Sequence, residues 1–421
     1  MNQYKIENKS LDSVELKALV VSRGVKVDKI IYKKLSKDYR IYPNSFTCNC
    51  FKLPDETIVM ATDIGFHLSA LSSMFSWDNL KLFKYMSDMT TPFKIKLDQD
   101  KPALYYNNEK VCNISFLPKT DFFNQKTTSG MPFIGNAVMQ GCNWVAFQCL
   151  WPCEYACAGK PCQYCFSGGQ FETLAKKNKP MPFVPSPKDV AEVINYAIDN
   201  DNCDSIQITG GSTFKAEKEE SYIISYLEAI NKYVGRDKIK GEILLYITPP
   251  DKKEVIDRYF ELGVDRIACS LEVWDDERAN IITPGKREFT GKKRHLEALT
   301  YIAEKYGPNK AFCNFIIGLE SIETLKEGAT YLAERGIIPS ASIWMPFGKP
   351  VMGSMKTPDL EYFRQVKEIF GDLYMKYNLT PAGGCGLNVC VEKDIWKWAK
   401  ERKNIKYKDD TSKKSDFVKQ Y

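Results

Sequence analysis

Four cysteines stand close together in the stretch WPCEYACAGKPCQYCFSGG, residues 151–169: Cys153, Cys157, Cys162 and Cys165. Thiolates are the ligands that iron-sulfur clusters and many zinc sites use. The chain has 14 cysteines but only two histidines, His67 and His295, so metal chemistry would depend on thiols rather than imidazoles. Four thiols could close a zinc site, whereas three would leave one iron of a four-iron cluster open to another ligand.

The spacing within this stretch favours the open cluster. Cys157, Cys162 and Cys165 form a CX4CX2C pattern, with Tyr164 directly before the last cysteine and Phe166 directly after it. An open iron can chelate the amino and carboxylate groups of a ligand, and S-adenosylmethionine is the sulfonium cofactor used in radical chemistry of this kind. The competing interpretation is a zinc site made by all four cysteines.

The elements that would hold this loop follow a repeated order of strand, loop and helix from about residue 142 onward. Counting WVAFQCL (144–150) as the first strand gives six strand-helix units, and helical crossovers make neighbouring strands parallel. Six such units predict an α/β fold, a partial (βα)6 TIM-like barrel. Sites in such folds lie at the carboxyl ends of the strands, and the cysteine stretch follows the first strand directly. The other predicted strands are 204–211, 242–250, 265–272, 311–320 and 340–347, and the helices are 186–200, 220–235, 251–263, 290–307, 321–336 and 358–377.

Four regions are expected along the chain. Residues 1–140 contain short apolar stretches between turns and predict an additional β-rich N-terminal region. Residues 141–350 form the barrel, and residues 351–402 a C-terminal helix with a cysteine-containing segment. The lysine-rich end, 403–421, is typical of a charged, disordered tail.

Together the cysteine stretch and the later strand ends resemble the radical S-adenosylmethionine (radical SAM) superfamily, in its biotin synthase-like branch. The usual signature of that superfamily is CX3CX2C with an aromatic residue before the last cysteine, so the first spacing here is one residue longer. Cys157 is nearest to the standard position for the first ligand, and Cys153 is the alternative. The resemblance implies a [4Fe-4S] cluster on three thiolates and S-adenosylmethionine on the fourth iron. It also implies that S-adenosylmethionine is cleaved reductively to a 5'-deoxyadenosyl radical. This radical would abstract hydrogen from a small molecule or a cofactor precursor.

The same resemblance implies residues that contact the cofactor. QITGGST matches the glycine-rich motif after the second strand, SLEVWDDERANIITPGK the fourth-strand segment, and NFIIGLES the fifth-strand motif near the adenine. The competing interpretations are an ordinary turn for the glycines, an exposed pair with Asp275 for the arginine, and barrel core for the isoleucine. The matching positions are Gly210, Gly211, Ser212, Thr213, Glu272, Arg278, Ile316 and Gly318.

The other cysteines bear on the type of reaction. Biotin synthase inserts sulfur from a second cluster, but the second and third strands carry no cysteine, and Cys313 is displaced by one residue from the matching position at Phe312. Sulfur insertion by that route is therefore disfavoured. Cys385 and Cys390, in PAGGCGLNVCVEKD, would either ligate an auxiliary cluster or be buried and inert.

Composition restricts the functional classes to which the protein could belong. The 421 residues are 44% hydrophobic and 27% charged, with a net charge of +6, and no apolar run is long enough to span a membrane. The start lacks the apolar core of a secretory signal, so we expect a cytoplasmic protein. The expected partners are a small-molecule substrate and an electron donor such as a flavodoxin or ferredoxin, with nucleic acid disfavoured. The hypothesis from another class is a non-enzymatic zinc or iron-sulfur protein with a structural, electron-transfer or nucleic-acid-binding role.

Overall fold

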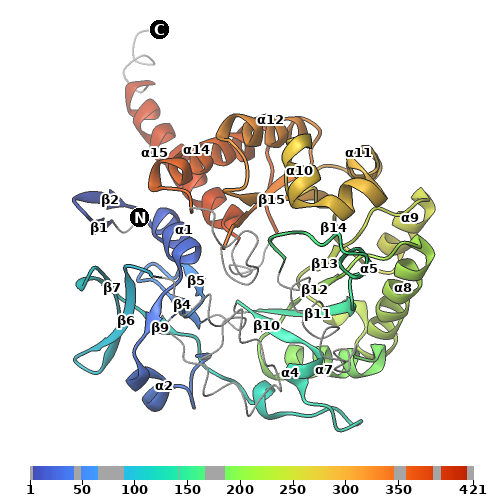
Figure 1. Ribbon diagram of the computed structural model, residues 1–421, viewed down its shortest axis with the longest axis horizontal. Helices are drawn as coiled ribbons and strands as arrows, with labels where there is room; N and C mark the ends of the chain where they lie inside the picture. Colours follow the sequence, from blue (N-terminus) through green and yellow to red (C-terminus); the bar gives the residue numbers. More distant parts are fainter. Residues whose placement is uncertain are drawn as a thin grey trace.

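A curved seven-stranded sheet forms the centre of the computed structural model, which describes residues 3–41, 49–64, 90–141, 143–165, 185–345, 357–382 and 390–414 (Figure 1). The strand order follows the sequence, and β11 to β16 run parallel, each beside the next. The sheet begins at β10 and ends at β16, so it curls without closing and confirms the expected partial barrel. The strands are β10 Val138–Gln140, β11 Trp144–Leu150, β12 Ser205–Gly210, β13 Ile243–Tyr246, β14 Arg266–Ala268, β15 Ala311–Ile317 and β16 Ile338–Ile343.

Amphipathic helices cover the outer side of this sheet (Figure 1). Ser186, Ser321 and Asp359 stand at the N-caps of three of them, and their side chains accept backbone N–H groups of the first turn. The alternation predicted from the sequence is thus confirmed; the antiparallel strand β10 and the short helix α10 (Asp276–Ile282) were not predicted. The covering helices are α7 Pro187–Asn200, α8 Ala216–Tyr233, α9 Lys253–Glu261, α11 Lys292–Tyr306, α12 Ile322–Ala333 and α14 Leu360–Lys376.

Side-chain alternation along the strands separates an apolar outer face from a more polar inner one. Phe147 of β11 packs on Tyr226 of α8, and Phe315 of β15 packs on Phe370 of α14, so these residues face the helices. Cys313 shares the outer side with Phe315 and is fully buried, as the sequence predicted. The alternate positions face the interior of the barrel, among them Gln148, Thr209, Tyr246, Asn314 and Ser342.

The N-terminal region contains strands and also helices (Figure 1). A hairpin, a three-stranded sheet in the order β5-β4-β9 and a four-stranded sheet in the order β3-β6-β7-β8 accompany two helices, α1 (Ser13–Arg23) and α2 (Lys29–Leu35). Two short helical turns, Asp121–Asn124 and Phe133–Asn136 (α4), lead towards β10. The strands are β1 Tyr4–Ile6, β2 Lys9–Leu11, β3 Lys26–Val27, β4 Asn49–Lys52, β5 Ile58–Ala61, β6 Phe93–Asp98, β7 Lys101–Tyr106, β8 Glu109–Asn113 and β9 Ser115–Phe116.

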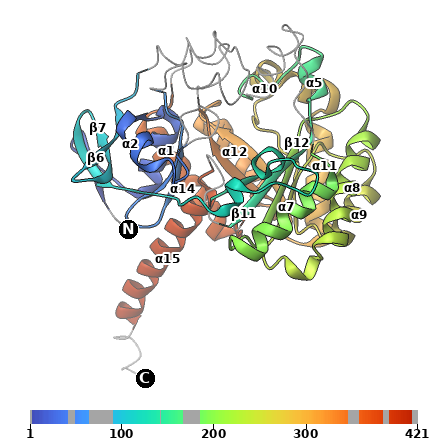
Figure 2. The ribbon, with the colours of Figure 1, turned by 90° about the horizontal axis from the view of Figure 1, so that it is seen from below.

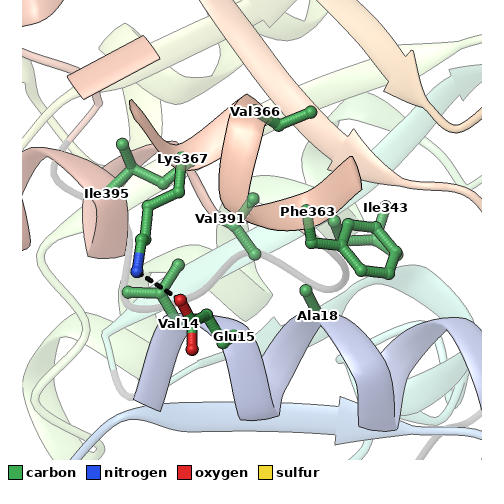
Figure 3. Close-up of a pocket in the computed structure, with 9 residues that line it drawn as sticks. All are labelled: Val14, Glu15, Ala18, Ile343, Phe363, Val366, Lys367, Val391 and Ile395. Atoms are coloured by element: carbon green, nitrogen blue, oxygen red, sulfur yellow. Dashed lines mark hydrogen bonds and ion pairs between the residues drawn. The ribbon is translucent and has the colours of Figure 1, made fainter. Parts of the chain in front are cut away.

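A buried ionic cluster joins α1 to the two C-terminal helices, α14 and α15 (Glu392–Lys414), beside a small, mainly apolar cavity (Figure 3). Lys367 Nζ lies 2.5 Å from Asp12 Oδ2 and 2.7 Å from Glu15 Oε1, and Lys17 Nζ lies 2.6 Å from Asp394 Oδ2. Buried charges are tolerated when they are paired in this way. The N-terminal region is therefore fixed against the far edge of the barrel.

Helix α15 projects away from the rest of the molecule (Figure 2). It continues to Lys414 and so extends into the segment 403–421, for which the composition predicted a disordered tail. Lysine, glutamate and arginine are good helix formers, which explains how a charged segment continues a helix that starts in the fold. Of the helices that the structure describes, none combines the length and apolarity that crossing a bilayer requires.

Candidate active site

The cysteine loop, residues 151–165, leaves the carboxyl end of β11 and turns once at α5 (Glu154–Cys157). Cys157 N donates to the Cys153 carbonyl at 3.1 Å, and Cys165 N donates to the Cys162 carbonyl at 3.0 Å, which folds the loop back on itself. Cys157 is exposed, while Cys153, Cys162 and Cys165 are partly buried. Burial raises the pKa of Cys162 to about 12, and the neighbours that raise it further include Cys165 and Cys153, whereas Lys286 lowers it.

The glycine turn after β12 lies directly against this loop. A Cβ on Gly211 would stand 2.6 Å from Cys153 Cα, so only glycine allows the approach. Ser212 N donates to Cys153 Sγ at 3.4 Å, and Glu154 N donates to the Ser212 carbonyl at 2.8 Å. Thr213 Oγ1 donates to the Lys215 carbonyl at 2.7 Å, which closes the turn. The structure thus brings the four predicted turn residues, Gly210 to Thr213, beside the cysteines.

A buried carboxyl that the sequence did not indicate supports the same turn. Glu219 of α8 accepts a hydrogen bond from Thr248 N at 2.8 Å, and Thr248 Oγ1 donates to Ser212 Oγ at 2.9 Å. Burial raises the pKa of Glu219 to about 7, while hydrogen bonds from Thr248 and Thr213 oppose the shift. Nothing in the sequence separates Glu219 from other glutamates at the start of α8, because its burial depends on the end of β13.

Glu272 lies after β14, facing the cysteine loop across the barrel mouth. Its Oε1 accepts from Lys286 Nζ at 3.0 Å, and its Oε2 accepts from Asn314 Nδ2 at 2.9 Å. Burial lowers the pKa of Lys286, but the negative charge of Glu272 and the hydrogen bond with its carboxylate outweigh this effect, so the pKa is raised. Lys286 is therefore the ion-pair partner of the predicted acid, and no feature of the sequence had indicated it.

Arg278 is exposed on α10, where its guanidinium Nη1 donates to the Leu319 carbonyl at 2.8 Å. Asp275 caps this helix by accepting from the Arg278 backbone N at 2.7 Å. The guanidinium thus connects α10 to the segment after β15. The hydrogen bond with the Asp275 side chain is made by the backbone N–H of Arg278 and not by its guanidinium. The structure does not bring Arg278 into the group formed by Glu272 and the cysteines.

The fifth-strand positions lie beside a small apolar cluster at the barrel mouth. Ile316 is 9% exposed, and Gly318 has φ 110°, a left-handed conformation that favours glycine, with Pro358 close by. Tyr164, the aromatic residue before the last cysteine, packs against this cluster, which fixes the end of the cysteine loop. The cluster consists of Val273, Ala279, Ile282, Ile316, Leu319 and Trp344.

The other residues singled out in the sequence lie apart from the cysteine loop or outside the described residues. Cys390 lies at the start of α15 with its Sγ 3.2 Å from Ser342 Oγ, on the inner side of the sheet. Cys385, its proposed companion in an auxiliary cluster, lies outside the described residues. His67 and Phe166 also lie outside them, and His295 is a buried residue of α11 whose pKa burial lowers to about 3.

The donor set fits an iron-sulfur cluster. Four thiols lie within one short loop, and thiolates are the usual ligands of such clusters. The backbone N–H of Ser212 donates to one of these thiols, and hydrogen bonds of this kind to sulfur tune a cluster. The same four thiols could also close a zinc site, and metal analysis distinguishes the two.

A comparison with protein families agrees with this geometry. The family model described as the radical SAM superfamily matches residues 154–337, from the cysteine loop to the start of β16. Residues 154–337 form a radical SAM domain. Radical SAM proteins use a [4Fe-4S] cluster and S-adenosylmethionine, so this protein is a radical SAM enzyme. Its assignment to the biotin synthase-like branch stays a prediction.

Similar proteins include one curated enzyme and several solved structures. Bacteriochlorophyllide c C-7(1)-hydroxylase of Chlorobaculum limnaeum is 24% identical over 298 residues, which are 68% of this chain and 73% of that protein. Among solved structures, a radical SAM methyltransferase from Sphaerobacter thermophilus is 12% identical with a TM-score of 0.41, covering 77% of this chain and 86% of its own. HydG, a maturase of the [FeFe]-hydrogenase, is 14% identical with a TM-score of 0.39, covering 51% of this chain. This chain spans 47% of HydG, about half its length.

Proposed function

We propose that the protein binds a [4Fe-4S] cluster through Cys162, Cys165 and a third cysteine of the same loop, and that S-adenosylmethionine binds beside it. The contact between the cysteine loop and the glycine turn is the observation that carries this proposal. Two hydrogen bonds, from Ser212 N to Cys153 Sγ and from Glu154 N to the Ser212 carbonyl, join them at the carboxyl edge of the sheet.

The third ligand is Cys153 or Cys157, and the contacts favour Cys153. Its thiol accepts the Ser212 N–H at the glycine turn. Cys157 has the spacing closer to the usual signature, but its side chain is exposed. A cluster that has to exclude water is better served by the partly buried thiol.

The cofactor nucleotide would lie between the glycine turn and the ends of β14 and β15. Gly210 to Thr213 offer backbone groups to the methionine moiety, and Glu272 offers its carboxylate to the ribose. Arg278 would reach the cofactor carboxylate from α10, with a planar guanidinium suited to bidentate pairing. Ile316 and Gly318 would pack against the adenine.

When bound, the cluster supplies the electron that cleaves S-adenosylmethionine to methionine and a 5'-deoxyadenosyl radical, which removes a hydrogen atom from the substrate. The protein's own residues position and shield this chemistry. Tyr164 and the apolar cluster around Ile316 exclude water from one side of the loop. Lys286 places a positive charge beside the carboxylate of Glu272.

The substrate would be a small molecule or a cofactor precursor that enters the barrel. Inner-facing side chains near the mouth are neutral hydrogen-bonding groups, including Gln148, which is exposed, and Thr209, which is half-buried. The hydroxylase of Chlorobaculum limnaeum, named for a bacteriochlorophyllide, is consistent with a substrate of the cofactor-precursor type. We further propose a cytoplasmic location and an electron donor of the flavodoxin or ferredoxin class.

Anaerobic purification tests this function directly. The protein should contain iron and labile sulfide, and with S-adenosylmethionine and dithionite it should form 5'-deoxyadenosine, measured by mass spectrometry. Cys153→Ala should lose both the cluster and this product, while Cys157→Ala should keep most of each. Zinc bound by all four cysteines, with no 5'-deoxyadenosine, would overturn the proposal in favour of a structural protein.

A further inference from the structure

A line of hydrogen bonds crosses the inner side of the sheet and ends on Glu272. We name it the Glu272 network; its side-chain distances are Lys286 Nζ to Glu272 Oε1 3.0 Å, Asn314 Nδ2 to Glu272 Oε2 2.9 Å, Ser342 Oγ to Asn314 Oδ1 2.9 Å and Cys390 Sγ to Ser342 Oγ 3.2 Å. Its members come from β15, β16, the segment after β14, the helical turn Lys286–Thr290 and the segment just before α15. Residues 118 positions apart in sequence, Glu272 and Cys390, are joined in this way.

Glu272 needs such support because its backbone is strained. Its φ is 71°, a left-handed conformation that costs a non-glycine residue about 1 kcal/mol or more and persists only where the surroundings impose it. Glu272 N donates to the Asn314 carbonyl at 2.9 Å, and Ile316 N donates to the Glu272 carbonyl at 3.0 Å. β15 thus fixes the Glu272 backbone, and Asn314 fixes its side chain as well.

The direction of every hydrogen bond in the network follows from the carboxylate. An ionised carboxylate only accepts, so Asn314 presents its amide N–H₂ to Glu272 and turns its carbonyl oxygen towards Ser342. The single hydroxyl hydrogen of Ser342 goes to that oxygen, which leaves Cys390 to donate its S–H to Ser342 Oγ. Cys390 therefore stands at the end of the network as a thiol.

The surroundings of Cys390 agree with this assignment. Burial, together with the negative charge of Glu392, raises its pKa and so favours the thiol over the thiolate. The auxiliary cluster at Cys385 and Cys390 stays a prediction, because Cys385 lies outside the described residues.

The carboxylate remains able to bind a ligand while it is held. Each oxygen of Glu272 accepts one described hydrogen bond, and each has a second lone-pair direction. The C-terminal segment is attached to the edge of β16. Cys390 forms an antiparallel bridge with Ser342, and Val391 N donates to the Ala341 carbonyl at 2.9 Å. That segment therefore completes the support of Glu272.

We propose that Asn314, Ser342 and Cys390 are positioning residues for Glu272, and that the C-terminal segment completes the S-adenosylmethionine site by supplying the Cys390 thiol as the last donor. The proposal rests on the proposed function, in which Glu272 contacts the cofactor ribose. None of the three residues is expected to touch the cofactor itself.

Binding of S-adenosylmethionine to the full-length protein, reconstituted with its cluster, tests the network. We expect Ser342→Ala to raise the Kd about 10-fold, equivalent to about 1.4 kcal/mol, and Cys390→Ala to raise it about 5-fold. Cys390→Ser keeps a donor for Ser342 and should bind within about 2-fold of wild type. Iron content and the thermal unfolding midpoint should be unchanged in all three variants, and Cys203→Ser, at a buried cysteine in the turn before β12, serves as a control.

The outcomes separate the network from the function on which it rests. Unchanged affinity in both Ser342→Ala and Cys390→Ala would overturn the network, whereas a wild-type protein that does not bind S-adenosylmethionine would overturn the proposed function as well. Loss of iron in Cys390→Ser would make Cys390 a cluster ligand and would refute its assignment as a hydrogen-bond donor. An equal loss of affinity in Cys390→Ser and Cys390→Ala would also refute it, because only the donor distinguishes these two.

Discussion

The cysteine loop and the Glu272 network face each other across the barrel mouth but are built in opposite ways. The loop takes all its thiols from residues 153–165, one continuous segment. The network takes its five members from five segments between residues 272 and 390. Lys286 is ion-paired with Glu272, and its positive charge also opposes the rise in the pKa of the Cys162 thiol. Residues that bind the cluster are thus local in sequence, whereas residues that orient the acid are assembled only by folding.

The largest expected effect follows from a change in the loop. Cys162→Ala should reduce cluster iron and 5'-deoxyadenosine to background, because a three-thiolate cluster loses a ligand without a substitute. Cys269→Ala is the matched control, since Cys269 is also buried but packs in the core of the barrel. Iron analysis of the two variants, purified side by side, measures the difference; equal cluster content in both would contradict the assignment of Cys162.

The next effect concerns Glu219, which supports the glycine turn, and the pH dependence of the free energy of unfolding. Burial raises the pKa of Glu219 to about 7, well above an unfolded value of about 4.3. Between these values the folded state binds more protons than the unfolded state, so the free energy of unfolding falls as the pH rises. Relative to wild type, Glu219→Gln should gain roughly 3 kcal/mol between pH 4.5 and pH 7.5.

Urea unfolding at a series of pH values measures this difference. Glu217→Gln, an exposed residue of the same helix, is the control and should follow the wild-type curve. If the stability of Glu219→Gln relative to wild type stayed constant from pH 4.5 to pH 7.5, the Glu219 carboxyl would not be the buried acid described above.

A smaller effect tests the contact between loop and turn. Gly211→Ala places a methyl group 2.6 Å from Cys153 Cα and should cost about 1–3 kcal/mol. Gly241→Ala is as crowded, with Ser205 Oγ and Asp204 within reach, but lies at the opposite end of β12. Both variants should lower the unfolding free energy, while only Gly211→Ala should also weaken retention of the cluster, measured as iron per chain. Equal iron retention would separate the turn from the site.

The smallest effect is expected at Arg278, which is exposed and outside the Glu272 network. Arg278→Ala should raise the Kd for S-adenosylmethionine about 5-fold, near 1 kcal/mol, because one ionic contact at the rim would be lost. Arg258→Ala, an exposed arginine of α9, should leave the Kd unchanged. Equal binding by the two variants would mean that Arg278 only joins α10 to the Leu319 carbonyl.

The sequence predicted the regular elements well for a physical reason. Each barrel helix carries its own periodic apolar face and cap, such as Ser186 before α7, and each buried strand is a short apolar run between turns. β10 and α10 were missed because one is a three-residue edge strand and the other a seven-residue helix, too short for a clear period. In the site, the cysteine cluster and the glycine turn were visible because their members are neighbours in sequence.

The amino-acid sequence by itself determined that thiols, a glycine turn and an acid would meet at one edge of a parallel sheet, because strand alternation places successive loops there. Only the tertiary structure decided which cysteine lies against the turn, that Lys286 pairs with Glu272, and that Cys390 is hydrogen-bonded into the network from the C-terminal segment. Such contacts depend on strand register and side-chain direction between segments that are distant in sequence, and no local pattern encodes them.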